Sequence, residues 1–207
     1  MTHKLLIATG SGHKFAELRE LLDLPGTEMV SLADVGITDA PEENGRTFED
    51  NAVAKAIHYA RESGLPTLAD DSGIEVDALG GRPGVKTRRY AGPNATDEQN
   101  NRKLLAELDG FYSPDERTAR YQCVLALAEP DDSRPVIRET TNGTFEGRIA
   151  FSPRGSSGFG YDPIFEPDFE PPGGRTVGEL TQAEKNRVSH RALAARAMRG
   201  RLIERGF

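Results

Sequence analysis

The sequence has a single cysteine, and it has no long apolar run. Because Cys123 has no second cysteine to pair with, an intramolecular disulfide is excluded. Cys123 lies in the apolar run 121–128, where a buried and unreactive thiol is expected. No stretch approaches the roughly 20 apolar residues of a membrane-spanning helix, and the first apolar run is too short for the core of a signal peptide. We therefore expect a cytoplasmic protein.

The chain also lacks an excess of basic residues, and this excludes one class of function. It has 26 Lys and Arg against 33 Asp and Glu, for a net charge of −7. A sequence-independent nucleic-acid binder would present a basic face to the phosphates, so nucleic acid is not an expected partner. A small anionic substrate in a local basic pocket remains compatible with this balance. With 207 residues, 36% hydrophobic, and no internal repeat, the chain suits a single domain over 1–207, or one domain with two lobes.

The order of apolar segments and turns predicts an α/β fold with a mixed sheet. Leu5–Ala8 indicates a strand that leads through a glycine turn into a helix. A capping-box pattern at Thr47 opens a helix that ends near Ser63, and Leu65–Ala69 indicates a short strand after it. Strands that alternate with helices in this way favour parallel pairing in the first half of the chain.

Strands in the second half follow one another directly. The predicted elements are a helix at Thr96–Leu108, paired antiparallel strands at Ala119–Ala128 and Val136–Thr144 with a turn at Asp131–Ser133, and one last helix at Thr181–Leu202. This mixture argues against a purely doubly wound sheet.

A possible phosphate-binding segment is A-T-G-S-G-H-K, residues 8–14. A glycine turn that opens a helix directs free N–H groups and the positive helix end toward an anion, and Lys14 adds a full charge. The pattern is not a Walker loop, because G-x-x-x-x-G-K-[ST] is absent, and Phe15 stands where a third dinucleotide-binding glycine would be. Alone, the segment fits an ordinary strand-to-helix turn equally well.

A second group of residues is rich in carboxylates. Asp70 and Asp71 stand at the predicted end of a strand, a position that commonly faces a binding crevice. Glu42 and Glu43 precede the helix that leads into that strand. Hard oxygen ligands of this kind suit Mg²⁺, which binds one or two carboxylates and takes its other ligands from water and phosphate. The alternative is that Asp70 and Asp71 only cap a turn.

Two further segments carry ligand-binding residue types. In 156–165, glycines let the backbone approach a ligand closely, and Phe159 or Tyr161 offers a stacking face for a base, although core packing is the usual role of such rings. The segment 185–191 concentrates cationic side chains. Lys185 and Arg191 would point in different directions on a straight helix, so a shared site requires a helix break near Ser189. An exposed basic helix face is the alternative.

The motifs together resemble one enzyme family. A-T-G-S-G-H-K, T-F-E-D-N-A-x-x-K-A, A-D-D-S-G-I-E-V-D-A-L-G-G-R-P-G-V, R-Y-A-G, G-F-G-Y-D-P-I-F and E-K-N-R-V-S-H-R-A-L-A occur in the order found in the inosine/xanthosine triphosphate pyrophosphatase family. The resemblance implies Mg²⁺-dependent hydrolysis of ITP, dITP or XTP to the monophosphate and pyrophosphate. It also implies a homodimer, whose subunit is an elongated mixed sheet with two α/β lobes and a substrate cleft between them.

The resemblance also assigns site residues by position. The triphosphate loop corresponds to Thr9, Gly10, Ser11, Gly12, His13 and Lys14. Glu42 or Glu43, together with Asp71, match the metal-associated acids, and Asp71 is the catalytic residue that orients or deprotonates the attacking water. The remaining nucleotide contacts correspond to Ser72, Phe159, Gly160, Tyr161, Asp162, Lys185, His190 and Arg191.

Two departures from the family pattern affect local contacts. Ser11 replaces the usual asparagine of T-G-N-x-x-K, and the segment Lys86–Arg89 is unusually basic. For base choice, we expect Arg191, with His190 and the backbone N–H groups of 159–162, to donate to the oxygen at purine position 6. Adenine carries an amino donor there and would leave these groups unpaired.

Two other functions fit parts of the pattern. One is a related, septum-associated family that acts on modified pyrimidine or methylated nucleotides, and the intact Ser189-His190-Arg191 argues against it. The other is a nucleotide sensor without catalytic activity. Loss of the carboxylates would favour the sensor, yet Glu42, Glu43, Asp70 and Asp71 are all present.

Overall fold

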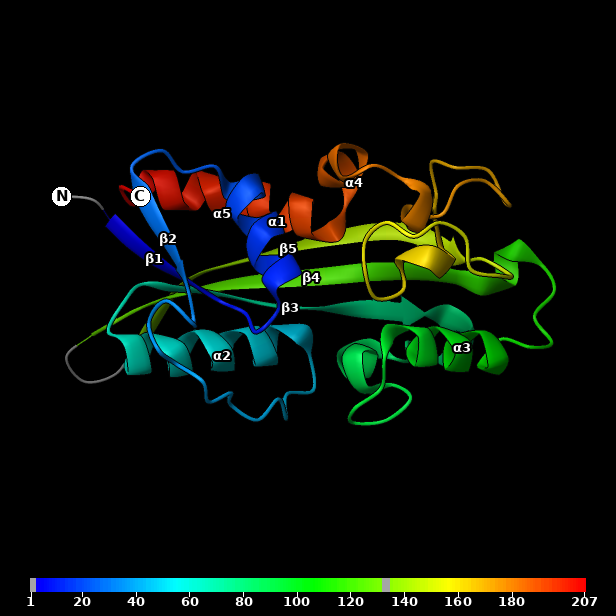
Figure 1. The fold of residues 1–207 in the computed structure, drawn as a ribbon, viewed down its shortest axis with the longest axis horizontal. Coiled ribbons are helices and arrows are strands. Elements are labelled where there is room, and N and C mark those ends of the chain that lie inside the picture. The colour runs from blue at the N-terminus through cyan, green and yellow to red at the C-terminus, as the bar shows by residue number, and fades with distance from the viewer. Residues whose placement is uncertain (1–2, 132–134) are drawn as a thin grey trace. The chain divides into compact units, whose positions relative to one another are not determined.

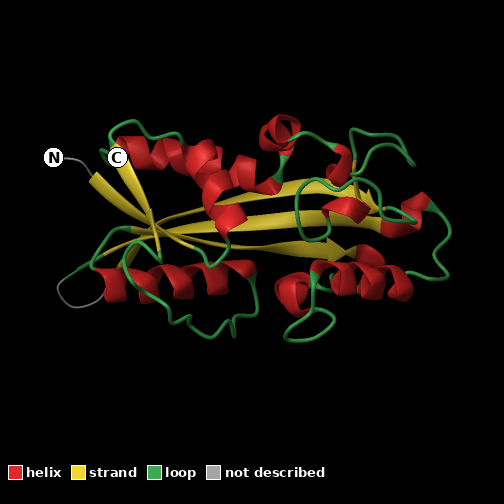
Figure 2. Cartoon of the chain, in the orientation of Figure 1, coloured by secondary structure: helices red, strands yellow, loops and turns green. Residues whose placement is uncertain are grey.

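The structure is a computed structural model that describes residues 3–131 and 135–207. The chain forms a six-stranded mixed sheet with helices (Figures 1 and 2). The strand order is β2-β1-β3-β4-β5-β6. Strand β1 pairs parallel with β2 and β3, whereas β5 pairs antiparallel with β6, so the predicted mixed α/β fold is confirmed. The strands are β1 His3–Ala8, β2 Thr27–Ser31, β3 Thr67–Val76, β4 Thr118–Glu129, β5 Val136–Ile149 and β6 Phe165–Pro167. The helices are α1 Gly12–Leu22, α2 Phe48–Ser63, α3 Asp97–Glu107, α4 Gln182–Val188 and α5 His190–Glu204.

The chain divides into two compact units. Unit 1 comprises Met1–Asp71, Cys123–Gly143 and Arg191–Phe207, and unit 2 comprises Ser72–Gln122 and Thr144–His190. Strands β3, β4 and β5 each contribute residues to both units. That these units are lobes of one domain stays a prediction. No helix among the described residues is both long and apolar enough to cross a membrane.

The core of unit 1 has two layers because successive strand residues point to opposite faces of the sheet. Leu5 and Leu68 pack with apolar residues of α1 and α5. Their neighbours Leu6 and Ala69 pack with α2, on the other face. Cys123 lies fully buried in the first layer, so the prediction of a buried cysteine is confirmed, and burial raises the pKa of its thiol to about 12.

The predicted helix starts are confirmed at two capping boxes. The Thr47 side chain accepts from the N–H of Asp50, and the Asp50 carboxylate accepts from the N–H of Thr47, so α2 begins at Phe48. Helix α2 ends at Ser63 and is capped by Gly64, which takes a φ of 65° that costs glycine little. Thr96 and Gln99 form the same reciprocal pair at the start of α3. Helix α3 then packs in the core of unit 2 through Leu104.

The predicted strand end at Asp70-Asp71 is wrong. Strand β3 continues through D-D-S-G to Val76, and eight of its ten residues are buried. Carboxylates are depleted in strands and disfavoured in buried positions, which is why the sequence indicated a turn. Because both side chains have charged partners here, the strand can continue past them.

The prediction of a single C-terminal helix is also wrong. Helix α4 ends at Val188, Ser189 is extended with φ −66° and ψ 156°, and α5 begins at His190. The break near Ser189 is the one that a shared site of Lys185 and Arg191 requires. The predicted strands at 119–128 and 136–144 are confirmed, with β5 extending to Ile149. The predicted turn at Asp131–Ser133 lies outside the described residues except for Asp131.

We expect Gly155→Ala to destabilise unit 2. Gly155 has φ 75°, and a Cβ there would overlap the backbone of Gly178. Strain of this kind costs about 1–3 kcal/mol, and the overlap with backbone adds to it. Gly200→Ala is the control, because Gly200 lies in α5 with open space around it and should gain about 0.5–1 kcal/mol in helix propensity. Urea unfolding measures both, and equal midpoints would contradict the expected strain at Gly155.

Candidate functional site

Asp70 and Asp71 lie in the middle of β3 and their side chains point to opposite faces of the sheet. Asp70 lies on the same face of β3 as Leu68 and points toward α1 and α5. Asp71 lies on the same face as Ala69 and points toward α2. They are 2% and 7% exposed. Buried carboxylates require pairing, so each face must supply cationic or donor groups of its own.

The Asp70 face is a closed network of two positive and two negative side chains. Lys14 Nζ lies 2.8 Å from Asp70 Oδ2, and Arg191 Nη2 lies 3.5 Å from the same oxygen. Arg191 Nη1 donates to Glu17 Oε2 at 2.6 Å, with the Arg191 side chain only 1% exposed. Burial by itself would raise the pKa of Asp70, but Lys14, Arg191 and Lys55 hold that pKa well below its usual range. These cationic neighbours therefore stabilise the ionised form of Asp70.

On the Asp71 face, Lys55 contacts two carboxylates. Lys55 Nζ lies 2.8 Å from Asp71 Oδ1 and 3.0 Å from Glu43 Oε1, so one ammonium serves two carboxylates. Asn51 Nδ2 donates to Asp71 Oδ2 at 3.2 Å. Asn51 and Lys55 are four residues apart and share one face of α2. We call Lys14, Glu17, Glu43, Asn51, Lys55, Asp70, Asp71 and Arg191 the charge cluster.

The pKa values on this face follow from burial and pairing. Burial raises the pKa of Asp71 above its usual value, although Lys55 offsets part of the rise. Burial by itself lowers the pKa of Lys55, but Asp71, Asp70 and Glu43 together raise it. Asp71 is thus the more basic of the two adjacent carboxylates.

Asn51 also fixes the loop that carries the acidic residues. Its Oδ1 accepts from the N–H of Gly45 at 2.8 Å, and a Cβ on Gly45 would lie 2.5 Å from that oxygen. This contact holds the loop so that Glu43 reaches Lys55. Glu42, in contrast, is exposed and accepts from Asn44 at 2.7 Å. Of the two glutamates, the structure brings Glu43 and not Glu42 to Asp71.

The residues around Asp71 fit a magnesium ion whose other ligands come from water and a phosphate. Among the described residues, no group of three or more His, Cys, Asp or Glu side chains is arranged to hold a metal. Mg²⁺ needs only one or two protein carboxylates when water and phosphate complete its shell. Asp71 and Glu43 can supply two, and Lys55 contacts both.

The predicted phosphate loop opens α1 as expected. Helix α1 begins at Gly12, and Ser11 caps it, because the Ser11 Oγ accepts from the N–H of Lys14 at 3.4 Å. The N–H of Ser11 donates to Thr9 Oγ1 at 3.2 Å. Gly10, Gly12 and His13 are exposed at this helix end. Serine in place of the family's asparagine therefore acts as the helix cap here.

In unit 2, Asp162 connects the predicted nucleotide contacts. Its carboxylate accepts from Lys185 Nζ at 2.7 Å, from Tyr121 OH at 3.2 Å and from the N–H of Phe159 at 3.0 Å. Asp162 and Lys185 are 2% and 4% exposed. The Lys185 ammonium also lies 4.5 Å from the centre of the Phe159 ring. Asp162, Lys185 and Phe159 thus form one rigid group.

The two aromatic candidates for base stacking differ. Tyr161 is 2% exposed, packs in the core of unit 2 and donates to the backbone oxygen of Thr87 at 2.9 Å. Phe159 is only half-buried. Of the two rings, Phe159 is therefore the more accessible. His190 stacks on Tyr121, with ring centres 4.6 Å apart and planes 6° from parallel.

Two other sequence candidates lie in exposed or half-buried positions. Ser72 is half-buried, immediately after Asp71 in β3. The basic segment forms a short 3-10 helix, Gly84–Arg89, in which Lys86 and Arg88 are exposed.

Several residues of these groups were missed by sequence reasoning. They are Glu17, Asn51 and Lys55 in unit 1, and Asp97, Asn101 and Tyr121 in unit 2. Asn51 and Lys55 fall inside the quoted T-F-E-D-N-A-x-x-K-A motif, and their spacing of four residues was a usable signal. Asp97 and Asn101 have the same spacing on α3, whereas a lone Glu17 carries no such signal.

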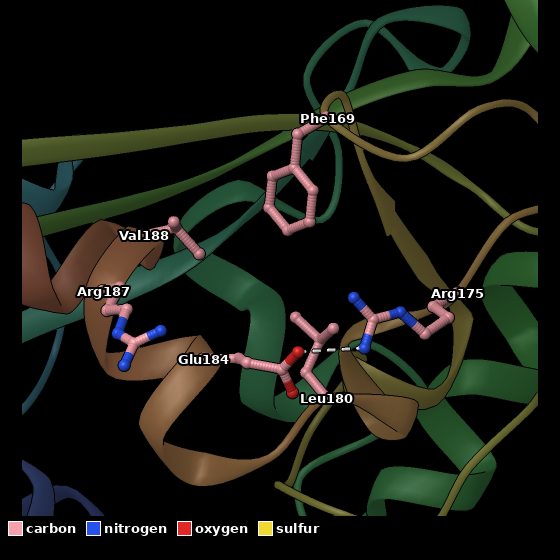
Figure 3. A pocket seen from close by; sticks show the side chains of 6 residues that line it. All are labelled: Phe169, Arg175, Leu180, Glu184, Arg187 and Val188. Atoms are coloured by element: carbon pink, nitrogen blue, oxygen red, sulfur yellow. Dashed lines mark hydrogen bonds and ion pairs between the residues drawn. The ribbon is translucent and has the colours of Figure 1, made fainter.

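A pocket of about 180 Å³ lies elsewhere in unit 2 (Figure 3). Arg175 Nη1 donates across it to Glu184 Oε1 at 3.0 Å. The lining residues are Phe169, Arg175, Leu180, Glu184, Arg187 and Val188, and none of them is a predicted site residue.

Comparisons with known proteins agree over nearly the whole chain. A profile of the Ham1 family matches residues 5–201. The chain is 50% identical over 201 residues to the dITP/XTP pyrophosphatase of Thioalkalivibrio sulfidiphilus, covering 96% of this chain and 98% of the relative. It is 47% identical to that of Methylococcus capsulatus, covering 98% and 97%. A solved HAM1 protein from Coxiella burnetii is 40% identical, with a TM-score of 0.85, covering 98% and 99%.

We expect Arg191→Met to lower the free energy of unfolding by about 3–5 kcal/mol, because it leaves Glu17 buried without its guanidinium partner. Arg201→Met, on the same helix but 56% exposed, should stay within about 0.5 kcal/mol of the wild type. Adding Glu17→Gln to Arg191→Met should recover part of the loss. Denaturant unfolding tests all three, and a loss below about 1 kcal/mol for Arg191→Met would contradict the pairing.

Proposed function

Because the chain belongs to the Ham1 family, we propose that it hydrolyses the triphosphates of deaminated purines, such as ITP, dITP and XTP. The products are the nucleoside monophosphate and pyrophosphate. The observation that carries this proposal is the buried Asp71, with its raised pKa, beside Lys55 and Glu43. The names printed for the most similar relatives, dITP/XTP pyrophosphatases, support the substrate class.

In the proposed reaction, a water oxygen attacks the α-phosphorus and the bond to the β-phosphate breaks. Asp71 orients this water and accepts its proton, since burial makes the carboxylate a stronger base. Lys55 and Asn51 each donate to a different oxygen of Asp71, so its plane is fixed while lone pairs remain on both oxygens.

The triphosphate is held by the N-terminal end of α1 and by Lys14. The helix end offers N–H groups and positive potential, and the Lys14 side chain, in the first turn, is 21% exposed. Asp71 and Glu43 would hold a divalent cation, for which we propose Mg²⁺. When bound, that ion neutralises charge on the phosphate oxygens.

The base is assigned to the Phe159 ring and to Lys185. Phe159 supplies a half-buried stacking face, and Lys185 is held rigidly beside it by Asp162. Arg191 is a weaker candidate for base reading than the sequence indicated, because its guanidinium is bonded to Glu17 and Asp70. We therefore assign Arg191 to the support of Lys14 and Asp70. The homodimer and the cytoplasmic location remain predictions.

We expect Asp71→Asn to lower kcat by about 10²–10⁴-fold with the fold retained, because the amide keeps the shape of the side chain but is a far weaker base. Asp70→Asn is the comparison. It should lose stability, because Lys14 and Arg191 keep their charges beside a neutral amide. Steady-state kinetics and thermal unfolding separate the two. Near-normal turnover of Asp71→Asn would remove Asp71 from the mechanism.

We expect pyrophosphate, and not orthophosphate, as the first inorganic product, because the bond between the α- and β-phosphates breaks. Phosphorus NMR at an early time point, with ITP as substrate, distinguishes the two. Stepwise release of orthophosphate through a diphosphate would refute the proposed reaction while leaving nucleotide binding intact.

A further inference from the structure

The backbone N–H groups of the Phe159–Asp162 loop already donate within the protein. The N–H of Phe159 donates to Asp162 Oδ2 at 3.0 Å, and that of Asp162 donates to the Phe159 oxygen at 3.3 Å. The N–H of Gly160 donates to Asp97 Oδ2 at 2.7 Å. A base that is read by this loop must therefore displace one of these acceptors.

The acceptors differ in how firmly they are held. Asp162 is 2% exposed and is fixed by Lys185 and Tyr121, so withdrawing it would leave a buried ammonium beside it. Asp97 is an exposed side chain in the first turn of α3. Its carboxylate can turn into water at little cost in solvation. The Gly160 N–H is thus the donor of this loop that is released most easily.

A second residue of α3 keeps Gly160 in place when Asp97 leaves. Asn101, one helical turn after Asp97 and 7% exposed, donates from Nδ2 to the Gly160 carbonyl at 3.0 Å. Gly160 has φ 65°, a conformation that glycine adopts readily. Helix α3 therefore binds both polar groups of Gly160, one through an exposed carboxylate and one through a buried amide.

We propose that Asp97 is a specificity-determining residue. Its carboxylate accepts from the Gly160 N–H, and an acceptor oxygen at purine position 6 can replace it. Asn101 is a positioning residue that holds residue 160 through its carbonyl. The 6-oxygen of inosine or xanthosine can replace the carboxylate as acceptor. The 6-amino group of adenine is a donor and cannot. The inference rests on the proposed function, with Phe159 as the neighbouring stacking face.

The test compares Asp97→Ala with wild type, using kcat/KM for ITP and for ATP. Without the competing carboxylate, we expect KM for ITP to fall about fivefold, the value of one net hydrogen bond, and the ITP-to-ATP ratio to rise by the same factor. The lost negative charge favours both triphosphates equally and cancels in the ratio. Glu98→Ala is the matched control, since Glu98 carries the same charge in the same turn but pairs with Arg102, and its ratio should not change.

Asn101→Ala gives a second reading. It removes the bond to the Gly160 carbonyl, so residue 160 is held less firmly and its N–H is placed less well, and we expect the ITP-to-ATP ratio to fall both alone and in combination with Asp97→Ala. Hydrogen exchange of the Gly160 amide should be faster in Asn101→Ala than in wild type. An unchanged or lower ratio in Asp97→Ala would overturn the proposal and leave Asp97 as a support of the loop.

A measurement without turnover separates this inference from the proposed function. If wild type fails to convert ITP to IMP and pyrophosphate, the proposed function fails. The inference is then decided by amide NMR with IMP and AMP. We expect IMP, and not AMP, to shift the Gly160 amide proton, and Asp97→Ala to strengthen IMP binding about fivefold. An amide proton that neither nucleotide shifts, or that both shift equally, would overturn the inference.

Discussion

The structure of unit 1 depends on two adjacent carboxylates in the middle of a buried strand. Because Asp70 and Asp71 point to opposite faces of β3, each face of the sheet has to supply its own cations. Helices α1 and α5 bring Lys14 and Arg191 to one face, and α2 brings Lys55 to the other. In these different surroundings the pKa of Asp70 is lowered and that of Asp71 is raised.

Local signals predicted those elements whose determinants lie within a few residues of each other. The capping boxes at Thr47 and Thr96 and the glycine stop at Gly64 placed α2 and α3 within one or two residues. The turn predicted at Asp70-Asp71 was wrong, because the charges that keep this strand extended come from Lys14 and Arg191, distant in the sequence. Composition within a window does not contain that information.

The same contrast holds for the candidate site. The resemblance supplied Lys14, Asp71 and Lys185, but not what each touches, and single-residue reasoning assigned Arg191 to the base. The structure pairs Arg191 with Glu17, a contact that spans 174 residues. Similarly, the loop amides that looked available for a base are occupied by Asp97 and Asp162. Whether a donor is available depends on its contacts in the folded protein, and a sequence motif does not show those contacts.

Lys55 has a consequence for the balance of charge at Asp71. Its ammonium lies within 3.0 Å of both carboxylates that would hold a divalent ion, so the protein carries its own counterion there. Domains whose acidic or thiolate ligands lack such a partner fold only when their metal arrives. Here the repulsion between Glu43 and Asp71 is already offset by a covalently attached cation. The ion pairs of Lys55 therefore balance part of the negative charge of Glu43 and Asp71 within the chain itself.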